Sequence, residues 1–177
     1  MLRFPEPYRS VEMLDRLKVM TPNGAVPMGA VLVDQAIYAA FMAGAEQAIE
    51  FFHGYTYSGH PAAAAAGIAS LDVYEEEGLY QRANDMASVL ADAVHSLKGS
   101  PHVIDIRNIG MMAAVELLPR EGEPTLRAFD VFRRCFDAGV LVRTAGDALA
   151  LTPPLIIDAS QIDQIVTTIR HALEAVD

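Results

Sequence analysis

The sequence predicts an α/β protein whose C-terminal part is an α+β unit, in which a small, mostly antiparallel sheet carries helices. Three observations predict this class. Apolar residues recur at helical spacing over residues 79–99 and again over residues 160–176. Residues 102–119 instead alternate with a period of two, and a glycine divides them into two predicted strands. A short, wholly apolar run at residues 29–33 predicts a buried strand nearer the N-terminus.

Composition and charge limit the classes of function. Of the 177 residues, 52% are hydrophobic and 20% are charged, which is typical of a chain with a packed core. The formal net charge is −10, and the sequence has no run rich in lysine or arginine. Nucleic acids and anionic membranes both attract cationic surfaces, so we expect neither as a partner.

The sequence also predicts a cytoplasmic protein. Residues 1–20 lack the apolar segment of a signal peptide, and no apolar stretch approaches the ~20 residues that span a bilayer. The single cysteine, Cys135, excludes an internal disulfide and fits a reducing compartment. Its position among phenylalanines in a predicted helix predicts a small buried apolar side chain.

The first elements are predicted from turn signals and apolar runs. Residues 1–22 are atypical, because prolines interrupt them and their periodicity is weak. Asn23-Gly24 then marks a turn before the strand at residues 29–33, and a short helix is expected within residues 34–44.

Two long helices are expected next. Residues 60–78 contain an alanine block behind Pro61, which is tolerated in a first helical turn, and small side chains suit a buried or domain-connecting helix. Residues 79–99 form an amphipathic helix that Gly99 ends.

The remaining pattern completes the α+β unit. Strands are expected at residues 102–110 and 111–119, around Gly110, and a further strand pair at 140–144 and 148–154, around the turn at residues 145–147. A helix over residues 125–139 is expected to place its larger apolar residues on one face: Leu126, Phe129, Phe132 and Phe136.

The last helix is expected to begin near Ser160, capped by that hydroxyl with Asp163 three residues on. Its apolar residues are expected to face the core: Ile162, Ile165, Val166, Ile169, Leu173 and Val176.

A polar segment precedes the alanine-rich helix. The run GYTYSG places hydroxyls and backbone N–H groups just before a helix N-terminus, the arrangement that binds phosphate in many proteins. A structural alternative is that His53 caps a turn and that Tyr55 and Tyr57 are core aromatics. The spacing of His53 and His60 matches no standard zinc ligand pair, so we expect no metal site.

Arg143 lies in an otherwise apolar predicted strand pair, where an arginine is costly unless its guanidinium is satisfied. Asp147 is its only acidic neighbour in the local sequence. Two interpretations therefore stay open: a salt bridge across the sheet, or a bidentate clamp for a substrate carboxylate.

Four segments carry a family resemblance. The strings NGAVPMGAVLV, FFHGYTYSGHPAAAAAG, VIDIRNIGMMAAVEL and VLVRTAGDALALTPP occur in this order. Their content and spacing resemble class III pyridoxal-phosphate aminotransferases, and most of all the branch that uses ω-amino acids such as β-alanine with pyruvate. The resemblance covers nearly all of residues 23–177, and HGYTYSGHP is its most specific string.

The resemblance implies the type I aminotransferase fold and a homodimer. By this resemblance, residues 1–59 are a remnant of the large cofactor domain, residues 60–78 a connecting helix and residues 79–177 the C-terminal small domain. Thr56 and Tyr55 of the HGYT string would bind the cofactor, with Thr56 on its phosphate across the dimer interface. Arg143 would bind the carboxylate of the substrate, and could swing aside for a substrate without one. The implied reaction uses pyridoxal phosphate to transfer an amino group from an amino donor to pyruvate.

The catalytic lysine departs from the family pattern. Family members carry it five positions before the glycine of the NG turn, and in this chain that position is Val19. Lys18 lies one position early, and Pro22 stands where the family has threonine. Either a one-residue insertion gives Lys18 the role, or the lysine is absent.

The resemblance also predicts a truncated protein. The family's phosphate loop, ring-stacking aromatic and ring-nitrogen aspartate lie upstream of the matching segments, and residues 1–17 are too few to hold them. We therefore expect an aminotransferase portion that is inactive alone, or alternatively a non-catalytic remnant or dimerisation module. An apolar edge near residues 29–33, without its usual sheet, predicts self-association as a homodimer or higher.

Overall fold

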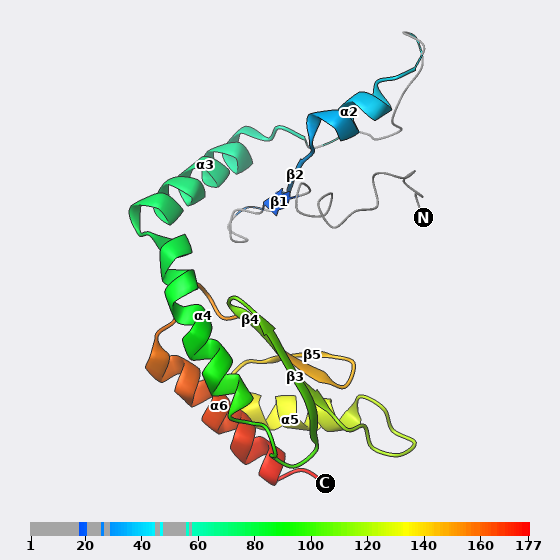
Figure 1. Ribbon diagram of the computed structural model, residues 1–177, viewed down its shortest axis with the longest axis vertical. Coiled ribbons are helices and arrows are strands. Elements are labelled where there is room, and N and C mark those ends of the chain that lie inside the picture. Colours follow the sequence, from blue (N-terminus) through cyan, green and yellow to red (C-terminus); the bar gives the residue numbers. More distant parts are fainter. Residues whose placement is uncertain (1–17, 21–25, 27–28, 45–46, 48–55, 57) are drawn as a thin grey trace. The chain divides into compact units, whose positions relative to one another are not determined.

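The computed structural model describes residues 18–20, 26, 29–44, 47, 56 and 58–177 (Figure 1). The chain divides into two compact units, which we call the N-terminal unit, Met1–Glu76, and the C-terminal unit, Glu77–Asp177. The domain boundaries expected after residues 59 and 78 stay a prediction.

The N-terminal unit contains a short strand pair and a short helix. Strands β1 (Lys18–Met20) and β2 (Ala30–Leu32) pair antiparallel, so the predicted strand at residues 29–33 is confirmed. Helix α2 (Gln35–Phe41) begins after Asp34, whose carboxylate accepts a hydrogen bond from the Ala36 N–H at 2.9 Å. An aspartate before the first turn satisfies an N–H group that has no partner inside the helix.

Helix α3 (Pro61–Glu76) is the predicted alanine-rich helix, with its proline in the first turn as expected. Its small and apolar residues are spread around all sides of the helix. Of its residues only Ala63 is buried, whereas Ile68, Leu71 and Val73 are exposed. Of the two expected alternatives, a buried helix does not hold within the described residues, and a domain-connecting helix stays a prediction.

The C-terminal unit is built on a four-stranded antiparallel sheet (Figure 1). Its strands are β3 (Val103–Ile109), β4 (Met112–Leu117), β5 (Arg143–Ala145) and β6 (Ala148–Leu151). The order across the sheet is β3-β4-β6-β5, so β3 and β5 are the edges. Both predicted strand pairs are confirmed, although β5 begins at Arg143 and not at residue 140.

Helices α4 (Leu79–His95), α5 (Leu126–Asp137) and α6 (Ala159–Glu174) supply the other layer. Alternation along β4 shows which face they cover, because Ala113, Val115 and Leu117 are buried while the residues between them are partly exposed. The α+β class is therefore confirmed, with one helix-covered face and one outer face.

The core lies between the helices and the covered face of the sheet. Its fully buried side chains come from all three helices and two central strands: Leu90, Val94, Leu97, Val115, Leu117, Val131, Cys135, Leu149, Ile162, Ile169 and Leu173. The predicted inward residues of α4 and α6 are buried or pack against this core.

One arginine attaches α4 to the segment before α6. The Arg82 guanidinium donates hydrogen bonds to three successive carbonyls, those of Leu155, Ile156 and Ile157, at 3.1, 3.0 and 2.7 Å. A guanidinium has five N–H donors in a planar arrangement, so one side chain can satisfy several carbonyls that have no strand partner.

The phenylalanines of α5 share one face, as expected, but this face is not the buried one. Phe129 and Phe136 are 46% and 60% exposed, and Phe132 only borders the core. The buried stripe consists of Ala128, Val131 and Cys135, one position earlier along the helix. These smaller side chains let the helix approach the sheet closely.

The predicted N-cap of α6, Ser160, is wrong by two residues. Asp158 is the N-cap, and its carboxylate accepts from the Gln161 N–H at 2.9 Å, while the Gln161 side chain accepts from the Asp158 N–H at 3.1 Å. This reciprocal capping box satisfies two N–H groups at once. Ser160 donates its hydroxyl to Asp158 at 2.7 Å and is not itself the cap.

Two features are absent from the described residues. None of their helices is long and apolar enough to cross a membrane. No cluster of histidine, cysteine and acidic side chains among them is suited to hold a metal ion.

Candidate functional site

Arg143 begins the edge strand β5, which pairs with β6 alone. Its side chain is exposed. The sequence-based premise that this arginine is enclosed in an apolar hairpin is therefore wrong, because the helices cover only the opposite face of the sheet. Arg143 needs no partner to be tolerated, and its guanidinium is accessible to a ligand.

One register row on the outer face contains Arg143. In this row Arg107, Ala114, Ala150 and Arg143 are successive cross-strand partners on β3, β4, β6 and β5. Side chains directly opposite each other in an antiparallel sheet lie on the same face. Two arginines therefore mark the two edges of this face, with two methyl side chains between them.

The two arginines differ in their partners. Arg107 contacts Asp105 at 3.0 Å and Glu116 at 2.5 Å, and these carboxylates raise its pKa, Glu116 more than Asp105. Arg143 makes no ion pair and no side-chain hydrogen bond with any residue that the structure describes. Within this row, Arg143 is the guanidinium that is open to an added carboxylate.

Asp147, the acid that could have paired with Arg143, is engaged elsewhere. Its carboxylate accepts from the Thr125 N–H at 2.6 Å, and its carbonyl accepts from the Leu117 N–H at 3.0 Å. It therefore joins the β5–β6 turn to the start of α5. The salt-bridge interpretation of Arg143 has no support among the described residues.

Thr56 belongs to the N-terminal unit and lies in a turn before α3. Its side chain is exposed and makes no hydrogen bond with a described residue. His60 occupies the start of α3, where its Nδ1 accepts from the Ala63 N–H at 3.3 Å. His60 is thus a helix cap, and the Thr56 hydroxyl is free to donate to an anion.

The structure describes only some of the other predicted site residues. Lys18 is the first residue of β1, opposite Leu32 on β2. Tyr55 and His53 lie outside the described residues. Thr56 and Lys18 belong to one unit and Arg143 to the other, so each is described within its own unit.

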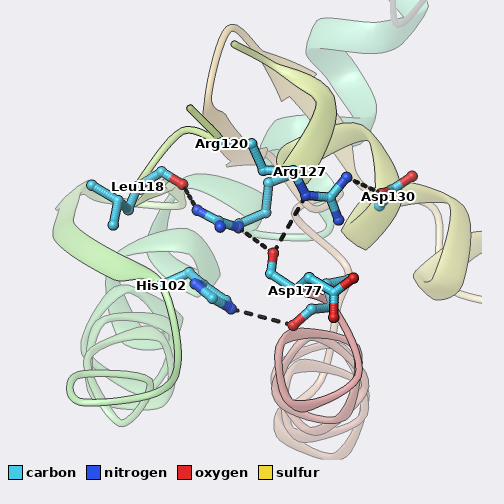
Figure 2. Close-up of polar contacts among 7 residues, drawn as sticks. His102, Leu118, Arg120, Arg127, Asp130 and Asp177 are labelled. Atoms are coloured by element: carbon cyan, nitrogen blue, oxygen red, sulfur yellow. Dashed lines mark hydrogen bonds and ion pairs between the residues drawn. The ribbon is translucent and has the colours of Figure 1, made fainter. Parts of the chain in front are cut away.

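Sequence reasoning missed a second polar cluster, at the end of α6 (Figure 2). Arg127 is 8% exposed and is the only buried charged residue among those described. Its guanidinium donates to the Asp177 carbonyl at 2.7 Å and to the Leu118 carbonyl. Arg127 lies four residues before Val131, so it is on the buried stripe of α5. This spacing was the sequence signal for its burial.

Neighbouring side chains extend this cluster (Figure 2). Arg120 contacts Asp130 at 2.7 Å, and the His102 ring lies 3.2 Å from the Val176 carbonyl. Every one of these contacts joins parts of the C-terminal unit to each other. The cluster therefore holds the end of α6 in place.

Cys135 is confirmed as a small core side chain, with no exposed surface. Burial raises the pKa of its thiol to about 11. Since the thiolate is the nucleophilic form of cysteine, this side chain does no chemistry at neutral pH.

The available donors fit an anionic cofactor and an anionic substrate. Thr56 offers a free hydroxyl beside a helix start, which suits a phosphate group. Arg143 offers an exposed guanidinium without a carboxylate partner, which suits a substrate carboxylate. Both observations agree with the roles that the family resemblance implies for these two positions.

Comparison with known proteins identifies relatives over most of the chain. The sequence profile of the family described as aminotransferase class-III matches residues 14–173, a range that includes Lys18. An omega-aminotransferase from Caulobacter vibrioides is 52% identical over 88% of this chain. A beta-alanine–pyruvate aminotransferase from Pseudomonas aeruginosa is 41% identical over 87% of it.

Solved structures agree with this similarity. An amine transaminase from an uncultivated Pseudomonas species, in its PLP-bound form, superimposes with a TM-score of 0.75 at 31% identity. The match covers 88% of this chain and 37% of that one. Likewise, the chain spans 35% of the length of each of the two relatives named above, or about a third.

Proposed function

Because this chain belongs to the class III aminotransferase family, we propose that it contributes part of a site that transfers an amino group to pyruvate. The amino donor is an ω-amino acid or an amine, and pyridoxal phosphate is the cofactor that this family uses. The two relatives named above act on substrates of this kind, as their names state.

The observation that carries the proposal is the open guanidinium of Arg143. It lies on an edge strand, beside the small side chain of Ala150, and has no carboxylate partner among the described residues. A planar guanidinium binds a carboxylate through two parallel hydrogen bonds, which fixes its orientation as well as its position. Arg143 thus binds and orients the carboxylate of pyruvate or of the amino acid.

Two residues of the N-terminal unit serve the cofactor in this proposal. The Thr56 hydroxyl donates a hydrogen bond to the phosphate. Lys18 supplies the amine that carries the cofactor, and it moves the proton at the substrate carbon that bears the amino group. When bound, pyridoxal phosphate supplies the electron sink for this chemistry.

Assembly is part of the proposal. A homodimer would let Thr56 of one copy serve the phosphate bound mainly by its partner, as the family resemblance implies. The order of residues in the turn before α3, with the free hydroxyl of Thr56 ahead of the helix, supports this role.

A carboxylate titration tests the role of Arg143. We expect pyruvate to shift the side-chain Nε–Hε NMR signal of Arg143 and to leave that of Arg107 in place, because Arg107 is already paired with two carboxylates. Arg143→Gln is expected to abolish binding. Methyl pyruvate, which lacks the charge, is the control ligand and is expected to cause no shift.

Two results would count against the proposal. Equal shifts at Arg107 and Arg143 would mean that pyruvate acts as a nonspecific anion. No shift at Arg143 would support the alternative function, that of a non-catalytic remnant or dimerisation module.

A further inference from the structure

Helix α5 carries an aromatic stripe on its outer side. Phe129, Phe132 and Phe136 follow each other along the helix, with ring centroids 5.7 and 6.3 Å apart. The inner side of the helix is filled by Ala128, Val131 and Cys135, so the stripe is not needed to close the core. Two residues of the stripe, Phe129 and Phe136, are 46% and 60% exposed.

Charges of both signs flank this stripe. Arg133 and Asp137 are exposed and lie four residues apart, on the side of the helix next to Phe129 and Phe136. Neither makes an ion pair with a described residue, in contrast to Asp130, which is bound by Arg120. An aromatic patch that carries one unpaired cation and one unpaired anion is complementary to a copy of itself.

The spacing fits a twofold axis. Consider two α5 helices that lie antiparallel, related by a twofold axis at the level of Cys135 along the helix. Each residue then faces the residue of the other copy that lies equally far from Cys135 on its other side. Arg133 of each copy then lies opposite Asp137 of the other, and the two Phe136 rings meet near the axis. Such a contact is isologous, because the same patch serves both copies.

We propose that the aromatic stripe of α5, with Arg133 and Asp137, is a self-association surface that binds a second copy of this chain. The rings supply the apolar area and the two symmetric ion pairs fix the antiparallel register. This surface differs from the exposed strand edge near residues 29–33 on which the sequence-based expectation of self-association rested. It is also independent of the proposed amino-transfer function, because neither Arg143 nor Thr56 takes part.

Charge reversal in two separate variants tests the proposal. In Arg133→Asp the facing residues are both acidic, and in Asp137→Arg they are both basic, so each variant alone is expected to associate roughly tenfold more weakly or worse. An equimolar mixture of the two variants restores both opposite-charge pairs in a heterodimer. The dissociation constants are measured by sedimentation velocity over a range of concentrations.

A matched control and one added variant separate the surface from a general charge effect. Arg134→Asp makes the same charge change at an exposed neighbour on another side of the helix, and it is expected to leave the dissociation constant unchanged. Phe136→Ser is expected to weaken association as the charge reversals do. Circular dichroism verifies that each variant is folded.

The mixture decides between a contact within one helix and a contact between copies. If Arg133 and Asp137 act on each other within one helix, mixing the two variants restores nothing. The proposal is overturned by that result, by a wild-type chain that stays monomeric at every concentration, or by charge reversals that behave like Arg134→Asp. Recovery of association in the mixture supports it.

Discussion

At the scale of single residues, the two arginines on the outer face of the sheet show that a side chain's partners decide whether it can bind a ligand. Arg107 and Arg143 share one register row, yet among the residues that the structure describes only Arg107 is paired with carboxylates. Register and partners are properties of the folded sheet. From the sequence we could identify Arg143 as a candidate, but not that Asp147 is held by Thr125 instead.

Loss of the buried Arg127 is expected to destabilise the C-terminal unit. Arg127→Met keeps much of the side-chain volume but leaves the carbonyls of Leu118 and Asp177 without this donor. We expect the free energy of unfolding to fall by about 2 kcal/mol, because two part-buried hydrogen bonds from a charged donor are lost. Urea denaturation measures the change.

Arg120→Met is the matched control for this prediction. Arg120 is more exposed and contacts Asp130, so its removal is expected to cost less than about 1 kcal/mol. Equal losses in the two variants would mean that burial of Arg127 does not set its contribution.

Asp158 is expected to make stability depend on acid pH. The Ser160 hydroxyl and then the Gln161 N–H hold the pKa of its carboxyl below its usual value. A carboxyl with a lowered folded-state pKa stabilises the protein above its unfolded-state pKa. That contribution is lost as the pH falls through the folded-state pKa.

The variant Asp158→Asn isolates this titration, because asparagine also caps helices but does not ionise. Thermal unfolding is followed over the range from about pH 5 to about pH 2, where this linkage acts. We expect the midpoint of the variant to fall less steeply with acid than that of the wild type. Parallel pH profiles would show that Asp158 does not contribute to the dependence.

At the scale of elements, α5 shows where sequence pattern is insufficient. Two sets of residues on this helix have the same spacing: Phe129, Phe132 and Phe136, and Ala128, Val131 and Cys135. Periodicity alone therefore supports either set as the inner face. Hydrophobicity favours the phenylalanines. Close packing against the sheet favours the smaller set, and that choice depends on the space between elements.

The strands and the other helices could be predicted because their signals are local. Gly110 turns between β3 and β4 with a φ of 52°, and Pro61 begins α3, both as expected. Strand order is different, because β4 pairs with β6 and leaves β5 at the edge. That pairing joins distant segments, so the exposure of Arg143 did not follow from the sequence.

The β5–β6 hairpin depends on the turn residue Gly146, whose φ is 63°. Side chains with a Cβ are strained in this left-handed region, and branched ones most. Gly146→Val is expected to lower the free energy of unfolding by about 1–2 kcal/mol, and Gly146→Asn by less, because asparagine tolerates this conformation better. Urea denaturation is expected to give that order, and an equal loss in both variants would contradict it.

At the scale of the whole molecule, the two units differ in what the sequence could reveal. The C-terminal unit contains the core that alternating and helical patterns predicted. In the N-terminal unit the alanine-rich helix α3 is apolar on all sides, yet only one of its residues is buried. Its composition is that of a helix that packs closely, so composition alone does not determine what covers it.

The candidate site residues are divided between the two units. Lys18 and Thr56 belong to one unit and Arg143 to the other, and the motifs that carry the family resemblance lie in both. The sequence could identify these residues because their motifs are specific. The one-residue offset of Lys18 from the family pattern is what leaves its role to experiment.

The most direct test of the proposed function uses the fact that the chain has two lysines, Lys18 and Lys98. Pyridoxal phosphate is added to the purified chain, borohydride fixes it covalently, and peptide mapping compares the labelling of the two lysines. Lys98 is exposed and reports nonspecific reaction. We predict preferential labelling of Lys18 that Thr56→Val weakens, whereas equal labelling of both lysines, unchanged in Thr56→Val, would contradict a cofactor site built from Lys18 and Thr56.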